Sequence, residues 1–207
     1  MKSLNRHMPS VPRDQFAMVP RSDVPRSTFP QTFTHKATYQ GNYLNPLYCE
    51  EVLPGDHFQG EVTIFARLAN LLFPLMDNIE FDTYFFFVPN RLVWTNWEKF
   101  MGEQNNPADS ISYTIPTVQS PVGGFAINSI YDHFGLPCAG QTLAGNTITV
   151  NALPFRAYYL IYNEWFRDEN LQNSKSFNTG DGPDSSGTYG LVNTSKKHDP
   201  FTSALPW

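Results

Sequence analysis

The sequence predicts a mainly β protein with helical and loop insertions, and three observations lead to this class. Aromatic residues make up 15% of the 207 residues and charged residues only 16%, below the roughly 25% charged residues of an ordinary globular chain. Much of the surface must then be uncharged, as in a protein with extensive partner contacts. The 17 prolines favour short strands and long loops over a helical bundle. Residues 78–88 alternate between two faces, as a strand does.

The first 31 residues are predicted to form an extended, basic, proline-rich arm. They contain five prolines and almost no apolar periodicity. Residues 1–26 hold five basic and two acidic residues, whereas the rest of the chain holds 9 basic and 17 acidic residues. Such an arm can neutralise phosphates, and the alternative is a solvated tail with incidental charge. The candidate nucleic-acid-binding residues are Lys2, Arg6, Arg13, Arg21 and Arg26.

Four stretches before residue 90 are predicted to be extended. Residues 32–43 and 58–67 have the pattern of strands, and 47–53 is a short extended piece followed by a turn at 54–56. The clearest strand is 78–88, where one face is apolar throughout and the other begins acidic and turns aromatic. We expect this strand to run into a region covered on both sides, and the proline that follows should end it.

Helices are predicted near residues 91–101 and 129–134. In the first, Thr95 and Glu98 have the spacing of a capping box, and Gly102 can close its end in the left-handed conformation. The second is short, with Ser129 and Asp132 as its capping pair and a glycine and a proline to stop it.

A longer helix is predicted over residues 154–170. It begins with a proline, at a position where the missing N–H costs little. Two neighbouring aromatic stripes give it a wide apolar face, which suggests that it is covered on two sides. Only the row of Arg156, Asn163 and Arg167 is expected to face solvent. Residues 171–197 are rich in Asn, Ser and Gly without periodicity, and we predict a surface loop.

No catalytic residue, metal site or cofactor is predicted. Glu80 and Asp82 share one strand face, which would suit a paired-carboxylate hydrolase, but solvated carboxylates are the favoured interpretation. The five histidines are scattered and the two cysteines lack motif spacing. Asp181 and Asp184 could contact a calcium ion, although a plain turn is the favoured interpretation. A signal peptide is not recognised and the longest apolar run is too short for a bilayer, so no membrane partner is expected.

Several segments, taken in chain order, are similar to one known family. They are VPRSTF at 24–29, LPGD at 53–56, NLLFPLMDNIEFDTYFFFVPNRLVWTNWEKFMGE at 70–103, PFRAYYLIYNEWFRDENL at 154–171 and HDPFTSALPW at 198–207. Together they resemble the major capsid proteins of the Microviridae, the small single-stranded DNA phages, and the gokushovirus branch in particular. The resemblance covers nearly the whole chain.

This resemblance implies a viral jelly-roll β-barrel. Because only about five or six strands are recognisable, short of the eight of a jelly roll, residues 32–207 are expected to be a partial jelly-roll capsid domain, the N-terminal part of a longer subunit. The insertions would be the three predicted helices and the loop. The implied function is structural and not enzymatic: copies of the subunit self-assemble into an icosahedral shell around a single-stranded DNA genome.

The same resemblance implies further partners and a location. The partners are other copies of the subunit, other phage structural or scaffolding proteins and the DNA genome; the location is the virion, after assembly in the host bacterial cytoplasm. Aromatic residues are enriched at binding hot spots, and the alternative is that they belong to the core. The candidate interface residues are Trp94, Trp97, Tyr158 and Trp165. A jelly-roll carbohydrate-binding module, in which aromatic side chains stack on sugars, is the alternative function.

Overall fold

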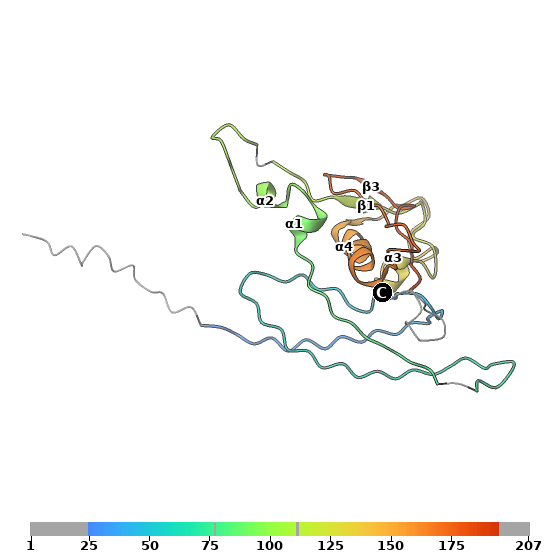
Figure 1. The fold of residues 1–207 in the computed structure, drawn as a ribbon. Helices are drawn as coiled ribbons and strands as arrows, with labels where there is room; N and C mark the ends of the chain where they lie inside the picture. The colour runs from blue at the N-terminus through green and yellow to red at the C-terminus, as the bar shows by residue number, and fades with distance from the viewer. Residues whose placement is uncertain (1–24, 77, 111, 195–207) are drawn as a thin grey trace, which may run out of the picture. The chain divides into compact units, whose positions relative to one another are not determined.

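The chain divides into two units, residues 1–34 and 35–207. The structure is a computed structural model, shown in Figure 1, and it describes residues 25–76, 78–110 and 112–194. The described part of the first unit contains neither helix nor strand. Every helix and strand named below belongs to the second unit.

A small mixed sheet of three strands lies in the second unit. Its strands are β1 (Thr117–Gln119), β2 (Thr149–Asn151) and β3 (Asp184–Ser185), in the order β2-β1-β3. The central strand β1 pairs antiparallel with β2 and parallel with β3, and Val118 lies opposite Asp184 in the parallel pair. This register places the carboxylate of Asp184, on the edge strand β3, beside the central strand.

The longest helix, α4, spans Leu153–Ile161 and continues directly as a π-helical turn, η2, over Tyr162–Phe166. A proline stands in its first turn, where a missing N–H is tolerated. None of the helices in the described residues is long and apolar enough to cross a membrane. The other helices are single turns: α1 (Asn90–Val93), α2 (Trp97–Phe100) and α3 (Ile130–His133).

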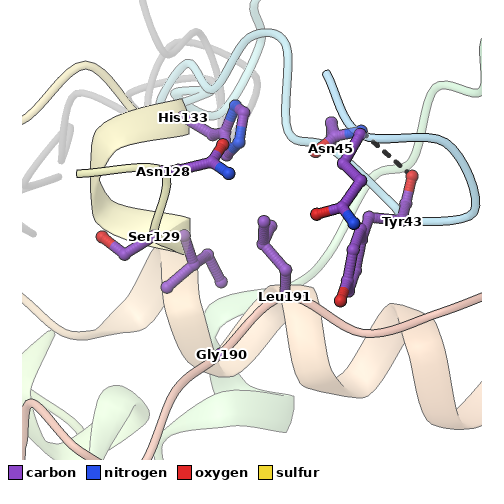
Figure 2. A pocket seen from close by; sticks show the side chains of 9 residues that line it. Tyr43, Asn45, Asn128, Ser129, His133, Gly190 and Leu191 are labelled. Carbon is purple, nitrogen blue, oxygen red and sulfur yellow. Dashed lines mark hydrogen bonds between the residues drawn. The ribbon is translucent and has the colours of Figure 1, made fainter. Parts of the chain in front are cut away.

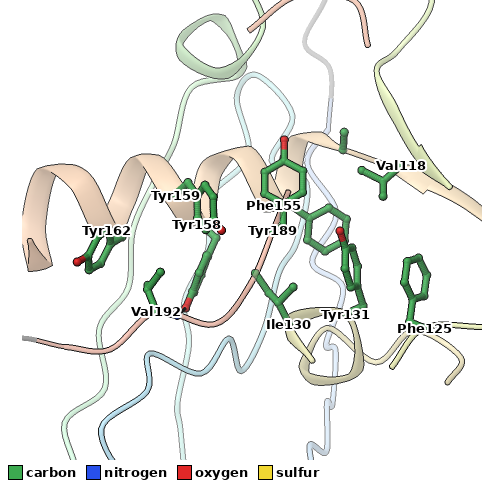
Figure 3. Packing of buried hydrophobic residues seen from close by; sticks show 11 residues of the cluster. Val118, Phe125, Ile130, Tyr131, Phe155, Tyr158, Tyr159, Tyr162, Tyr189 and Val192 are labelled. Carbon is green, nitrogen blue, oxygen red and sulfur yellow. Dashed lines mark hydrogen bonds between the residues drawn. The ribbon is translucent and has the colours of Figure 1, made fainter. Parts of the chain in front are cut away.

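The core of the second unit is a cluster of aromatic side chains along one face of α4, as Figure 3 shows. The ring of Phe155 lies 4.8 Å from that of Tyr131 and 5.1 Å from that of Phe134, both in edge-to-face geometry. These contacts fasten α3 against α4. The buried members of the cluster are Val118, Phe125, Ile130, Tyr131, Ala152, Phe155, Tyr158, Tyr159, Tyr162, Tyr189 and Val192.

The helices predicted near 129–134 and over 154–170 are found as α3 and as α4 with η2. The second ends at Phe166, earlier than predicted, because Arg167 is extended with φ −79° and ψ 130°. Of its predicted aromatic stripes, Phe155, Tyr158, Tyr159 and Tyr162 are buried in the core, whereas Trp165 is exposed.

The helix predicted over 91–101 is instead two single turns, α1 and α2, and this prediction is corrected. Trp94 between them is extended, with φ −144° and ψ 115°. The N–H of Thr95 donates to the carbonyl of Thr179 at 2.9 Å rather than to a carbonyl of a continuing helix. Tertiary partners thus override the local helical pattern.

The mainly β class is met only in part. Before residue 90, the described residues form no β-strand, and their one ladder contact is an isolated bridge between Tyr43 and Asn193. The predicted strands at 32–43, 58–67 and 78–88 therefore have no ladder among the described residues. A strand needs a neighbouring strand for its backbone hydrogen bonds, and alternation along a sequence does not name that neighbour.

Two predictions about the surface are also corrected. Arg156 was expected to face solvent, but it is fully buried. The loop predicted over 171–197 contains buried residues in its described part, among them Asp184, Tyr189 and Val192. The two errors have one cause, because Arg156 and Asp184 bury each other's charge.

Candidate functional site

Arg156, on α4, is the centre of a buried polar network. Its Nε donates to Asp184 Oδ2 and its Nη2 to Asp184 Oδ1, both at 2.8 Å. Its Nη1 donates to the carbonyl of Gly180 at 2.8 Å and to that of Val93 at 3.1 Å. Bidentate, charge-assisted pairs of this kind are strong and directional. One side chain therefore ties α4 to β3, to the turn before β3 and to α1.

Asp184 has two further donors. The hydroxyl of Tyr189 donates to Oδ2 at 2.6 Å, and the amide of Asn178 donates to Oδ1 at 3.3 Å. Burial raises the pKa of Asp184, but the hydrogen bonds from Arg156 and Tyr189 outweigh it, so the pKa lies below its ordinary value. The pKa of Tyr189 is raised, by burial and then by its bond to this carboxylate. The network therefore holds a charged Asp184.

Asp181 plays a similar part at the break between α1 and α2. Its Oδ1 accepts from Trp94 Nε1 at 2.8 Å and from Asn96 Nδ2 at 2.9 Å. The hydrogen bonds from Asn96 and Trp94 lower the pKa of this carboxyl group. The carboxylates of Asp181 and Asp184, which were considered as calcium ligands, thus already accept hydrogen bonds from protein donors. In the described residues, no group of three or more His, Cys, Asp or Glu could hold a metal ion.

Tyrosine hydroxyls fasten the backbone that follows β3. The hydroxyl of Tyr159 donates to the carbonyl of Thr188 and accepts from the N–H of Gly190, both at 2.9 Å. The hydroxyl of Tyr131, on α3, donates to the carbonyl of Ser186 at 2.9 Å. Side chains from two helices thereby satisfy backbone groups of an irregular segment that has little ladder of its own.

Tyr158 joins that segment to an early part of the chain. Its hydroxyl donates to the carbonyl of Leu44 at 2.7 Å and accepts from the N–H of Val192 at 3.0 Å. Burial raises the pKa of this hydroxyl, which stays neutral and can serve as donor and acceptor together. The residue was predicted as a subunit-interface anchor, but only 8% of it is exposed and its partners lie in the same chain.

An aromatic surface lies at the end of η2, and we define it by Tyr84, Phe86, Trp165 and Phe166. The ring centroids of Phe86 and Trp165 are 5.7 Å apart, and Phe166 meets Tyr84 edge-on at 5.3 Å. Trp165 remains 73% exposed. Tryptophan is enriched among binding hot spots, so an exposed Trp165 fits a contact with a partner.

The four predicted interface residues therefore divide into two pairs. Trp94 has no exposed surface and packs with Val93 and Leu153, so it follows the alternative of a core role. Tyr158 does the same. Trp97 is half-buried beside Trp94, with ring centroids 6.1 Å apart, and Trp165 is exposed. Subunit contact stays a prediction for Trp97 and Trp165.

Residues 58–87 form what we call the apolar stretch. Sixteen large apolar side chains in it are exposed, far more than scattered surface residues would provide. Glu80 and Asp82 are exposed in the same stretch. The sixteen are Phe58, Val62, Ile64, Phe65, Leu68, Leu71, Leu72, Phe73, Leu75, Met76, Ile79, Phe81, Tyr84, Phe85, Phe86 and Phe87.

The predicted nucleic-acid-binding residues lie mostly outside the described residues. Lys2, Arg6, Arg13 and Arg21 belong to that part, and Arg26 lies in the described part of the first unit. Their role remains a prediction.

Sequence reasoning missed the network of Arg156, Asp184 and Tyr189. One signal could have found it. Arg156 lies directly beside Phe155 in a helix whose wide apolar face predicts packing on two sides. An arginine buried in such a helix needs a carboxylate partner for its charge. The GDGPD turn at 180–184 supplies the acidic residues.

Three curated capsid proteins are similar to this chain, each named "Capsid protein VP1". The one from Bdellovibrio phage phiMH2K is 49% identical over 207 residues, which is 100% of this chain and 37% of the relative. The one from Chlamydia phage 1 is 44% identical over 97% of this chain and 36% of the relative. The one from Spiroplasma virus 4 is 34% identical over 92% of this chain and 36% of the relative. The chain thus spans little more than a third of the length of these relatives.

A family model described as "Capsid protein (F protein)" matches residues 17–207, which is most of the chain. The match includes the Arg156 network, the aromatic surface and the apolar stretch. It confirms the resemblance to Microviridae capsid proteins that the sequence motifs indicated, and the chain belongs to the phage capsid protein (F protein) family.

Proposed function

We propose that this chain serves in a structural subunit of an icosahedral viral capsid, which self-assembles and encloses a single-stranded DNA genome. The family match over residues 17–207 carries the proposal. The subunit works by binding and needs no catalytic group. Its place is the virion, after assembly in the host bacterial cytoplasm, and other phage structural or scaffolding proteins are its further partners.

A viral jelly-roll barrel is the fold that we assign to the assembled subunit. Residues 58–67 and 78–88 carry the period-two pattern of strands, although they form no ladder among the described residues. Pairing these stretches within a barrel would satisfy their backbone groups and cover the apolar stretch. An exposed apolar edge is otherwise prone to aggregation.

Contacts between copies would draw on the aromatic surface. The Arg156 network fixes α4, and η2 continues α4 without a break, so Trp165 is held at the end of a supported helix. Apolar area buried between copies contributes about 25 cal/mol per Å² before the entropic cost of association is subtracted. Weak contacts of this kind suffice when a shell repeats them.

The basic arm is our candidate for DNA contact. Its charge is opposite to that of the phosphate backbone, whereas the rest of the chain is acidic. A variant with Lys2, Arg6, Arg13, Arg21 and Arg26 all changed to Gln removes this charge.

Expression in bacteria of the subunit that contains this chain, followed by sedimentation and electron microscopy, tests the proposal. We expect closed shells whose DNA resists nuclease, and we expect the arm variant to assemble with less protected DNA. A soluble monomer that never assembles and binds glycans on an array would refute the capsid role and support the carbohydrate-binding module. Equally nuclease-resistant DNA in intact shells of both proteins would refute only the role of the arm.

A further inference from the structure

A cavity of about 240 Å³ lies within the second unit, between α3 and two other segments (Figure 2). One wall comes from residues 40–45 and another from the start of α3, and residues 190–191 complete the lining. The volume is below the roughly 300–1,000 Å³ of sites for drug-sized ligands, so a flat group of one or two rings is the size that it can accept.

The wall formed by residues 40–45 is anchored at several points. The N–H of Leu44 donates to the carbonyl of Val192 at 3.0 Å, and the N–H of Thr194 donates to the carbonyl of Asn42 at 2.8 Å. The Tyr158 hydroxyl donates to the carbonyl of Leu44 at 2.7 Å. The cavity is therefore bounded by hydrogen-bonded backbone.

Two buried polar atoms at the cavity have no hydrogen-bond partner in the described structure. One is Nε2 of His133, a residue only 5% exposed, and the other is Oδ1 of Asn45. The amide nitrogen of Asn45 uses one of its two hydrogens to donate to the carbonyl of Tyr43 at 3.1 Å. Buried polar groups nearly always have a partner, so these two atoms point to a bound polar group.

Four other lining side chains are polar but uncharged, and Ile130 and Leu191 add apolar surface. Gln40 and Asn128 supply amides, Ser129 a hydroxyl and Tyr43 a phenol ring, and none of the described Lys, Arg, Asp or Glu residues lines the cavity. Amide side chains can donate and accept at neighbouring positions, as the edge of a nucleobase does. A phosphate would find no Lys or Arg among the described lining residues.

We propose that this cavity binds one unpaired nucleobase, with the sugar and phosphate outside it. The inference rests on the proposed function, since the enclosed single-stranded DNA would supply the base. Asn45 and Gln40 read the edge of the base by hydrogen bonds, and the Tyr43 ring is available for stacking, which tolerates any base.

Deoxynucleosides test this site separately from the basic arm, because they carry no phosphate for the arm to bind. Binding to the purified full chain is measured by saturation-transfer NMR, with glucose as a neutral comparison ligand. We expect the nucleosides to bind and glucose not to. Asn45→Ala should weaken binding by about threefold to tenfold, the effect of one hydrogen bond. Gln40→Ala, at an exposed side chain, serves if the first variant fails to fold, and Asn173→Ala is the matched control at an exposed asparagine outside the cavity.

A second comparison separates this site from the capsid role. We expect a single-stranded oligonucleotide to bind better than an abasic strand of equal length, and Asn45→Ala to remove that difference. Equal binding of the two strands would overturn the base site and leave the arm and the capsid role intact. Glucose binding, or no nucleoside binding at the solubility limit, would also overturn it.

Discussion

Arg156 and Asp184 lie 28 positions apart and form a buried bidentate pair with two contacts of 2.8 Å. The exposed fractions of their side chains are 0% and 2%. Burying two charges is unfavourable unless their geometry is good and the remaining hydrogen bonds are made. The network meets this condition only when the segment around Tyr189 is docked on α4, so we infer that this segment docks as one cooperative unit.

The first prediction is that Arg156→Met lowers the free energy of unfolding by about 3–5 kcal/mol, because it leaves the Asp184 carboxylate buried without its cation. Urea unfolding followed by circular dichroism measures the change. The double variant Arg156→Met with Asp184→Leu should recover most of the loss, since a well-packed apolar pair can replace a buried ion pair.

Arg91→Met is the matched control for that experiment, because Arg91 is exposed on α1. We expect it to change the free energy of unfolding by no more than about 0.5 kcal/mol. Equal losses at the two arginines would contradict a special role for Arg156.

The second prediction concerns acid. The folded-state pKa of Asp184 lies below its ordinary value of 3.8, so the unfolded chain binds this proton more readily than the folded chain does. The stabilisation is complete above that ordinary value and is lost as the pH falls through the lower folded pKa. The difference in the free energy of unfolding between the wild type and Asp184→Asn should therefore be constant from pH 5 to 7 by the linkage relation and shrink below about pH 4. A difference that stays unchanged at about pH 3 would refute this linkage.

The third prediction is that Tyr158→Phe lowers the free energy of unfolding by about 1–3 kcal/mol, because it leaves the buried N–H of Val192 without an acceptor. Hydrogen exchange at Val192 should accelerate as well. Tyr48→Phe is the control, since its hydroxyl contacts Glu50 on an exposed surface at 2.8 Å. A larger effect from the control would show that the Tyr158 hydroxyl does not hold this segment.

The fourth prediction compares two neighbouring glycines with positive φ. A Cβ at Gly124 would lie 2.7 Å from both the carbonyl carbon and oxygen of Cys138, whereas one at Gly123 would meet nothing within 4 Å. Both alanine substitutions carry the penalty of roughly 1–2 kcal/mol for a side chain in the left-handed region. Only Gly124→Ala must also push the two backbones apart, so its melting temperature should be the lower of the two. Equal melting temperatures would show that the contact relaxes freely.

Local patterns predicted some elements well, for clear physical reasons. A proline at the start of α4, and an aromatic stripe repeating at helical spacing, are short-range features that the structure keeps. Gly102 and Gly135 have φ of +103° and +79°, as expected of residues that end helices. In each case the information lies within a few residues of the element.

Long-range partners could not be predicted in the same way. The break at Trp94 depends on Asp181, and the burial of Arg156 depends on Asp184, each of which lies in a Gly-rich stretch that resembles an ordinary surface loop. The strand pattern at 78–88 is clear, but its ladder partner is not among the described strands. Composition indicated partner contacts, yet it could not divide the tryptophans between core and surface.

The fifth prediction makes that division with Trp165 and Trp94. Trp165→Ser should leave the free energy of unfolding within about 0.5 kcal/mol of the wild type, because Trp165 is mostly exposed. If Trp165 is a hot spot worth about 2 kcal/mol, the concentration needed for assembly should rise roughly thirtyfold. Trp94→Phe should instead lower the free energy of unfolding, since it removes the Nε1 donor to Asp181 and loosens a buried site. Urea unfolding and sedimentation velocity on the same preparations measure both effects. Normal assembly by Trp165→Ser would remove this residue from the subunit interface, and only Trp97 would then remain of the four aromatic candidates.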